Sequence, residues 1–169
     1  MILIAVGSNL AGPAGSPQAN CQAALTALEK EGVRVVRRSH WYRSPAWPAS
    51  EAKRQPWYVN GVIAVETAHA PEDLLAALHR VEAALGRVRG PDTVNAARPI
   101  DLDLIDYDGL VREQPPILPH PRMAARAFVL HPLAEVAPGW CHPLSGAPLS
   151  ALLAGLPADA IAEPISERS

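Results

Sequence analysis

Two aspartates stand inside an apolar stretch of this sequence, in the segment Arg98-Pro-Ile-Asp101-Leu-Asp103-Leu-Ile105. Successive side chains of a β-strand point to opposite faces, so Asp101 and Asp103 project to one face and the leucines to the other. Neighbouring carboxylates repel each other unless a positive charge lies between them, and hard oxygen ligands suit Mg²⁺. An isolated Asp-X-Asp is more often a solvated strand face, so the surrounding residues must decide between these two interpretations.

Basic side chains flank the aspartate pair on both sides. Arg87, Arg89 and Arg98 precede it in the sequence, and His120 and Arg126 follow it. Taken singly, each has an ordinary explanation, such as an arginine near a helix C-terminus. Taken together, two carboxylates for Mg²⁺ and several cations are what a nucleoside triphosphate site requires. The sequence has no glycine-rich phosphate loop, so we expect arginines and metal to hold the phosphates.

Apolar periodicity and turn signals predict the elements that would position these residues. Strands are expected at residues 2–6, 33–43, 57–67 and 99–107, with helices between Ser16 and Gly32 and between Pro71 and Gly86. This order predicts an α+β fold, the ferredoxin-like split β-α-β-β-α-β arrangement of an antiparallel sheet with helices packed on one face. Residues 44–56 are expected to form a proline-punctuated loop, and residues 90–97 a flexible one.

The remaining segment is predicted to be a proline-rich C-terminal extension. It starts near residue 108, wraps the core, includes a helix near residues 149–153 and is expected to be flexible after about residue 157. A length of 169 residues and a hydrophobic fraction of 49% predict a single globular domain over residues 1–169, with its core at about 1–138.

Charge and hydropathy exclude several other classes of protein. A net charge of −2 argues against a general nucleic-acid binder, which would carry a broad basic surface. The apolar start at residues 1–6 is too short for a signal peptide, and no stretch approaches the ~20 apolar residues of a membrane span. Cys21 and Cys141 lack metal-type spacing and are expected to be reduced. The expectation is a cytoplasmic protein without a nucleic-acid or membrane partner.

The sequence resembles a known family, the 6-hydroxymethyl-7,8-dihydropterin pyrophosphokinases of folate biosynthesis. Six blocks from residue 2 to about residue 138 occur in the family's order and at nearly its spacing. The blocks are Ala5-Val-Gly-Ser-Asn-Leu10; Tyr42-Arg-Ser-Pro45; Tyr58-Val-Asn60; Val81-Glu82 with Leu85-Gly-Arg-Val-Arg89; Arg98-Pro-Ile-Asp-Leu-Asp-Leu104; and Pro119-His-Pro-Arg-Met123 with Arg126-Ala-Phe-Val-Leu130 and Pro132-Leu133.

This resemblance implies an ATP-dependent pyrophosphokinase. Such an enzyme moves a pyrophosphoryl group from ATP to the hydroxymethyl group of 6-hydroxymethyl-7,8-dihydropterin and releases AMP. The resemblance implies that Asp101 and Asp103 hold two Mg²⁺ ions and that Arg87 and Arg98 are catalytic. The implied ATP-binding residues are His79, Glu82, Arg89, His120 and Arg126. The implied pterin-binding residues are Asn9, Ser44, Pro45, Trp47, Tyr58, Asn60 and Phe128. Homologous enzymes are commonly monomers, so a monomer is expected.

Several positions depart from the family pattern. Asn95 stands where the family has a tryptophan in its mobile loop, His79 stands in place of a glutamine, and Trp47 in place of a small apolar residue. Residues 115–118 replace an Arg-Leu-Thr segment on the ATP side. Two alternatives stay open: a divergent pyrophosphokinase for a modified pterin, and a non-catalytic ferredoxin-like module for a small ligand or RNA. RNA recognition on such a sheet would call for exposed strand aromatics.

Overall fold

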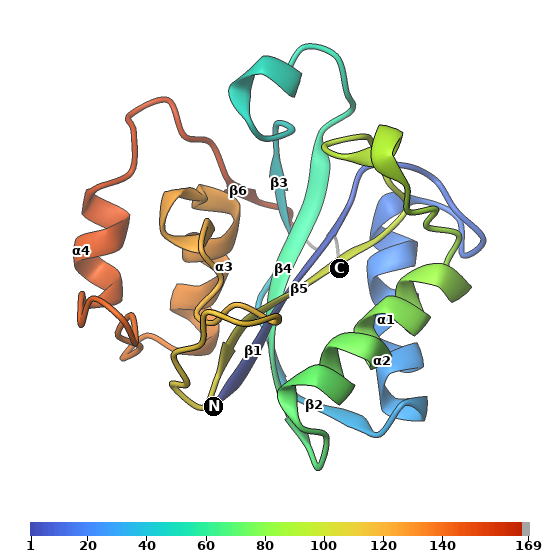
Figure 1. Ribbon diagram of the computed structural model, residues 1–169. Coiled ribbons are helices and arrows are strands. Elements are labelled where there is room, and N and C mark those ends of the chain that lie inside the picture. The colour runs from blue at the N-terminus through green and yellow to red at the C-terminus, as the bar shows by residue number, and fades with distance from the viewer. Residues whose placement is uncertain (167–169) are drawn as a thin grey trace.

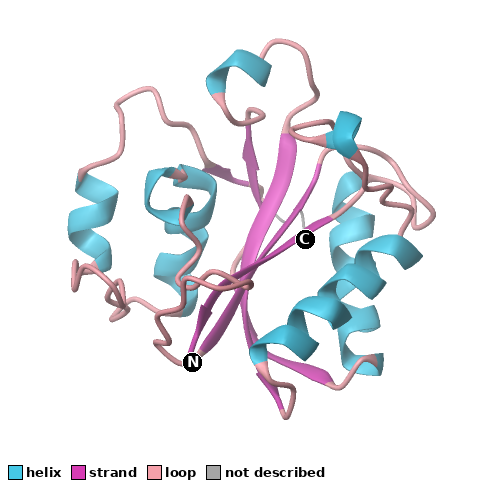
Figure 2. Ribbon diagram, viewed as in Figure 1, coloured by secondary structure: helices cyan, strands magenta, loops and turns pink. Residues whose placement is uncertain are grey.

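The computed structural model describes residues 1–166 and contains six strands and four α-helices in that range. The strands are β1 (Ile2–Ser8), β2 (Val33–Arg38), β3 (Tyr42–Ser44), β4 (Tyr58–Thr67), β5 (Asp101–Tyr107) and β6 (Glu163–Pro164). The helices are α1 (Pro17–Lys30), α2 (Pro71–Ala84), α3 (Ala127–Val136) and α4 (Leu149–Ala154). Short 3₁₀ turns lie at η1 (Ala49–Glu51), η2 (Pro91–Thr93) and η3 (Met123–Ala125). Figure 2 shows these helices and strands along the chain. The prediction of an α+β fold with an antiparallel sheet is confirmed.

The sheet runs in the order β5-β1-β4-β3-β6, and β2 also pairs with β4. The single strand predicted at residues 33–43 is therefore wrong in detail, because β2 and β3 are separate strands. Both pair with the long β4, β3 over residues 58–60 and β2 over residues 63–67. Trp41 fills the gap between them and lies so close to Gly61 that a Cβ there would be 2.8 Å from its ring. Only glycine permits that approach.

Each face of the sheet has its own apolar core. Along β1, Ile2, Ile4 and Val6 belong to the cluster under α1 and α2, whereas Leu3 belongs to the cluster under α3 and α4. This alternation is the period of two that a strand imposes on its side chains. Figure 1 shows the two helix pairs on opposite sides of the sheet. The two helices predicted for the core, α1 and α2, share one face, and the C-terminal segment with α3 and α4 covers the second face.

Local signals account for the ends of the helices. Ser16 caps α1 by accepting a hydrogen bond from the Ala19 amide at 3.2 Å, and Pro17 is the first residue of the helix. Helix α2 begins at Pro71 with two acidic residues in its first turn. Helix α4 matches the helix expected near residues 149–153. Helix α3 and strand β6 were not predicted from the sequence. Within residues 1–166, no helix is long and apolar enough to cross a membrane.

Candidate active site

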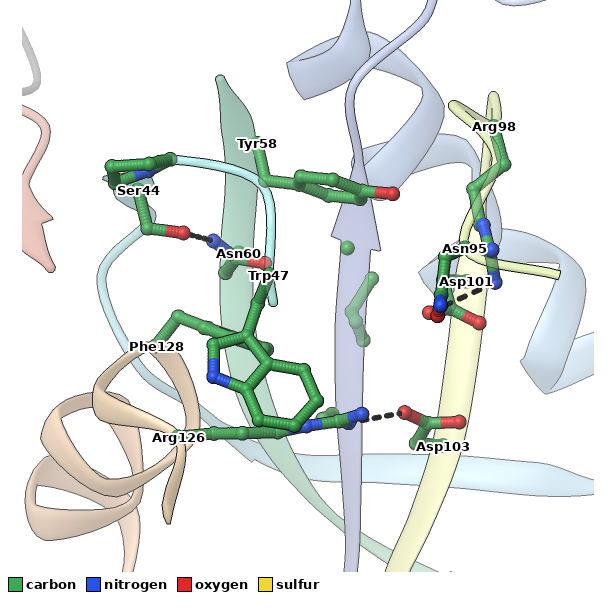
Figure 3. A pocket seen from close by; sticks show the side chains of 14 residues that line it. Ser44, Trp47, Tyr58, Asn60, Asn95, Arg98, Asp101, Asp103, Arg126 and Phe128 are labelled. Carbon is green, nitrogen blue, oxygen red and sulfur yellow. Dashed lines mark hydrogen bonds and ion pairs between the residues drawn. The ribbon is translucent and has the colours of Figure 1, made fainter. Parts of the chain in front are cut away.

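The carboxylates of Asp101 and Asp103 lie on β5 and are surrounded by basic side chains. Leu102 and Leu104 pack into the core under α1 and α2, so the two aspartates face the other way, as the strand period predicts. The Arg87 Nη1 lies 2.6 Å from Asp101 Oδ1. The structure therefore brings the aspartate pair and the basic residues of distant segments together. Arg98 lies 3.6 Å from Asp101, and Arg126 lies 3.3 Å from Asp103 (Figure 3).

Glu82 anchors the arginines on the α2 side of this site. Its side chain is 1% exposed, and one carboxylate oxygen contacts both Arg87 and Arg89, the latter at 2.7 Å. Its other oxygen accepts a hydrogen bond from the Leu102 amide at 3.3 Å. Burial raises the pKa of Glu82 to about 6, although the neighbouring arginines oppose that shift. Burial by itself would lower the pKa of Arg87, but Asp101 and Glu82 together raise it above its ordinary value.

A wide pocket opens on one side of the aspartate pair. Its lining includes arginines from the segment after α2, from the loop before β5 and from the segment before α3, which gives it the positive charge that phosphate groups require. The predicted ATP-binding residues that line it are His79, Arg89, His120 and Arg126, and the two predicted catalytic residues, Arg87 and Arg98, line it as well. Arg122, Leu75 and Ile117 also line it and were not predicted. Arg122 belongs to the Pro119–Met123 block and Ile117 to the segment 115–118 that the resemblance puts on the ATP side, so both had an available signal, whereas Leu75 has none.

A second, narrower pocket lies on the other side of the pair. Asn60 and Ser44 form its polar wall, since the Asn60 Nδ2 donates to Ser44 Oγ at 2.8 Å and both residues are buried. Gly7 lies against them, and a Cβ at this position would be 3.1 Å from the Asn60 side-chain oxygen. The pocket is lined by six predicted pterin residues, namely Ser44, Pro45, Trp47, Tyr58, Asn60 and Phe128 (Figure 3). Flat aromatic side chains beside a buried amide suit a planar heterocycle.

The two pockets join at the aspartate pair. Asp101, Asp103, Arg98, Arg126 and Asn95 line both of them. A group held in the narrow pocket and a phosphate chain held in the wide one would therefore meet beside the carboxylates.

Burial and neighbouring charges shift the pKa values of Asp103 and His120, which lie where the two pockets join. The pKa of Asp103 is raised by its desolvation and by the charge of Asp101, and Arg126 opposes the shift. Burial, followed by the charge of Arg126, lowers the pKa of His120 to about 4. His120 is therefore neutral at pH 7, and its 3.8 Å approach to Asp103 is not an ion pair there.

Hydrogen bonds tie the loops around both pockets to each other. Asn9 is 2% exposed; its amide donates to Gln55 at 3.0 Å, and its oxygen accepts from the Arg98 amide at 2.8 Å. Gln55 in turn donates to the carbonyl of Asn95 at 2.6 Å. Of the predicted site residues, Asn9 and Glu82 line neither pocket. The role of Gln55 was missed, because a glutamine in a proline-punctuated loop gives no periodic signal.

The aspartate pair fits a hard divalent cation only in part. Carboxylate oxygens are the ligands that Mg²⁺ prefers, and the cations that neutralise them here are arginines. Within residues 1–166, no three His, Cys, Asp or Glu side chains are grouped closely enough to hold a metal ion by themselves. Phosphate and water oxygens would have to complete the coordination, which is the usual manner of Mg²⁺ binding in phosphoryl-transfer sites.

Comparison with known proteins gives a consistent result. Residues 3–138 match the family described as 7,8-dihydro-6-hydroxymethylpterin-pyrophosphokinase. The chain is similar to the 2-amino-4-hydroxy-6-hydroxymethyldihydropteridine pyrophosphokinase of Pseudomonas aeruginosa, with 42% identity over 163 residues that cover 95% of this chain and 94% of the relative. The folic acid synthesis protein fol1 of Schizosaccharomyces pombe is 35% identical over 161 residues, which are 94% of this chain and 21% of that protein.

A solved structure shares the fold. The wild-type HPPK-DHPS of Plasmodium falciparum has a TM-score of 0.64 at 10% sequence identity. The likeness covers 90% of this chain and 44% of that chain, and at this identity it concerns the fold alone.

Proposed function

The chain belongs to the 7,8-dihydro-6-hydroxymethylpterin-pyrophosphokinase family of ATP-dependent enzymes, and we propose how its two joined pockets carry out pyrophosphoryl transfer in folate biosynthesis. The narrow pocket holds 6-hydroxymethyl-7,8-dihydropterin, and the wide pocket holds ATP. The pterin hydroxyl oxygen attacks the β-phosphorus of ATP and releases its proton to water, the bond from that phosphorus to the α-phosphate oxygen breaks, and AMP leaves. One observation carries the proposal: the two pockets share Asp101, Asp103, Arg98 and Arg126, where the reacting groups must meet.

Each set of residues has a distinct part in this proposal. Asn60 and Ser44 pair with the polar edge of the pterin, while Tyr58 and Phe128 cover its ring faces. Arg87 and Arg98 place positive charge beside the transferring phosphates, where the transition state needs it. Asp101 and Asp103 hold Mg²⁺, with two ions expected, and the metal neutralises phosphate charge when it is bound. His120 is neutral at pH 7 and donates a hydrogen bond to the nucleotide without adding charge.

We also propose the finer features of the fold that the sequence predicts. The pairing of β5 with β1, of β1 with β4 and of β4 with β2 supports a ferredoxin-like core. The segment after β5, with α3 and α4, is then an extension that closes the second face of the sheet.

The reaction products test the assignment directly. The protein, ATP, Mg²⁺ and 6-hydroxymethyl-7,8-dihydropterin should yield AMP and pterin diphosphate in equal amounts, which ³¹P NMR and chromatography resolve. Asp101→Asn and Asp103→Asn should each lower turnover by about 10²-fold or more, because several kcal/mol of charge stabilisation is lost. Asp108→Asn, just beyond the same strand and outside both pockets, is the matched control.

Three results would overturn the proposal. Formation of ADP in place of AMP would mean transfer of a single phosphoryl group. Near-normal turnover by Asp101→Asn would remove the metal assignment. A clear preference for a substituted pterin alcohol in a substrate panel would favour the modified-pterin alternative that Trp47 raises.

A further inference from the structure

The guanidinium of Arg126 lies in the shared wall of the two pockets with aromatic rings near it. Its carbon is 4.9 Å from the centre of the Trp47 ring and 5.5 Å from that of Phe128. Trp47 belongs to the loop after β3, and Phe128 belongs to α3, so the two rings come from separate parts of the chain. Figure 3 shows the Trp47 indole beside the extended Arg126 side chain, whose end points toward Asp103.

Arg126 is unusual among the arginines that contact an aromatic ring in residues 1–166. Its side chain is only 12% exposed, whereas Arg43, which lies 5.6 Å from the Trp57 ring, is 61% exposed. The Arg126 Nε is buried and has no hydrogen-bond partner among the described residues. Burial lowers the pKa of Arg126, and the charge of Asp103 opposes that shift. A cation–ring contact is stronger for a largely buried guanidinium than for an exposed one.

A divalent cation bound to the aspartates would compete with Arg126 for the charge of Asp103. The cation would draw the Asp103 charge toward itself and repel the guanidinium. The aromatic rings do not compete for the metal, so they would keep the guanidinium in place with its N–H groups free for an anion. Preorganisation of this kind raises affinity, because the side chain loses no further freedom when the anion binds.

We propose that Trp47 is a positioning residue that holds Arg126 by a cation–ring stack for contact with the phosphates of the nucleotide. Trp47 then acts on the wide pocket although it stands in the narrow one. The prediction for nucleotide binding rests on the proposed function, but the stack itself does not. A role confined to the pterin wall would instead change pterin affinity alone.

The stack is tested first without any substrate. In ¹⁵N NMR spectra, the Arg126 Nε–H resonance should carry a ring-current shift that Trp47→Leu reduces clearly, although Phe128 still contributes, and that Trp47→Phe largely retains. Trp57→Leu is the control: it removes the contact between the exposed Arg43 and the Trp57 ring, and it should leave the Arg126 Nε–H resonance unchanged. If Trp47→Leu does not fold, Trp47→Met can be used in its place to remove the indole. An Arg126 resonance unchanged by loss of the indole would overturn the proposal whether or not the protein has pyrophosphokinase activity.

Calorimetry with Mg²⁺ and a non-hydrolysable α,β-methylene ATP analogue then tests the consequence. Trp47→Leu should weaken analogue binding about 3- to 30-fold, and Trp47→Phe should keep it within about 3-fold of the unaltered protein. In an Arg126→Met background, Trp47→Leu should have no further effect. Equal losses in both backgrounds, or a loss of pterin affinity alone, would contradict the positioning role. Absence of AMP production by the unaltered protein would instead contradict the proposed function.

Discussion

The guanidinium of Arg87 bridges Asp101 on β5 and Glu82 on α2. Its Nη1 lies 2.6 Å from Asp101 Oδ1 and also contacts Glu82 Oε2. Arg87 is 10% exposed, so this bridge is largely screened from water. The bridge ties α2, through Glu82, to the strand that carries the aspartate pair. Glu82 therefore acts through other residues, and its loss should be visible in stability as well as in activity.

Replacement of Glu82 should destabilise the protein. Glu82→Ala leaves Arg87 and Arg89 with one fewer carboxylate and removes the acceptor of the Leu102 amide, so we expect a loss of about 2–4 kcal/mol in the free energy of unfolding. Glu82→Gln keeps an acceptor and should cost less. Urea denaturation measures both losses. Glu72 lies on the same helix and forms an ion pair with Arg112 at the surface. Glu72→Ala breaks this pair and should lower the free energy of unfolding by less than about 1 kcal/mol. Equal losses at the two positions would mean that the buried bridge contributes no special stability.

Replacement of Asn60 should separate the two pockets functionally. Asn60→Ala removes a buried amide that is held by Ser44 Oγ at 2.8 Å and lines only the narrow pocket. A ligand edge matched to that amide would be left unpaired, so pterin affinity should fall about 10- to 100-fold. Nucleotide affinity should change by less than about 3-fold. Calorimetry gives both constants. Ser39→Ala removes a buried hydroxyl between β2 and β3 that accepts from the Val62 amide outside both pockets, and it controls for loss of a buried hydrogen bond.

The sequence was sufficient where a local pattern determines the structure. The alternation of Asp101 and Asp103 with leucines predicted a shared face, and both carboxylates line the two pockets. Pro71 and the acidic residues after it correctly marked the start of α2. Helix α3 was missed because Pro132 lies inside it, and proline removes a helical hydrogen bond. Most of α3 is buried, and this packing compensates for the missing bond.

Features that depend on long-range contacts could not be predicted from the sequence. Strand β6 exists through its pairing with β3, about 120 residues earlier in the chain. The prediction that the chain is flexible after about residue 157 is not tested by this pairing, and residues 167–169 lie outside the described part. Motif position also does not reveal which way a polar side chain points. Glu82 and Asn9 both belong to site motifs, yet both bind the protein's own groups.

Alkaline pH should destabilise the fold through Cys21. Burial raises the pKa of its thiol from 9.0 to about 12. The unfolded chain therefore releases this proton at lower pH than the folded chain does, so stability falls as the pH rises from 9 toward 12. The slope is about 1.4 kcal/mol per pH unit for one group. Urea denaturation at pH 8 and pH 10 should show a smaller decrease for Cys21→Ala than for the unaltered protein.

Thiol titration checks the burial of Cys21, which is the cause of this shift. In the folded protein at pH 8, a disulfide reagent should modify the exposed Cys141 rapidly and the buried Cys21 only after unfolding. Cys141→Ala is the matched control, because it removes the fast reaction and should leave the pH dependence of stability unchanged. Rapid modification of both thiols in the folded state would contradict the burial of Cys21.

The loop of residues 90–97 should close over the pockets when both substrates bind. Val94 is 75% exposed, so the loop lacks an apolar anchor there and is held by polar contacts. One of these is the 2.6 Å hydrogen bond from Gln55 to the Asn95 carbonyl, and another joins the Arg98 Nε to the Ala96 carbonyl at 2.9 Å. Residues with few buried apolar contacts open at low free-energy cost. Closure would exclude water from a highly charged transfer and complete the arginine set around the phosphates.

Limited proteolysis measures this closure. A protease of broad specificity should cleave within residues 90–97 rapidly in the free protein, and Gln55→Ala should make cleavage faster because it removes the tether at Asn95. Gln18→Ala, on the exposed surface of α1, should leave the rate unchanged. Addition of the pterin with Mg²⁺ and a non-hydrolysable ATP analogue should suppress cleavage about 10-fold or more, since closing the loop by even 1.4 kcal/mol reduces the open population tenfold. Cleavage at the same rate with and without both ligands would mean that the loop does not act as a lid.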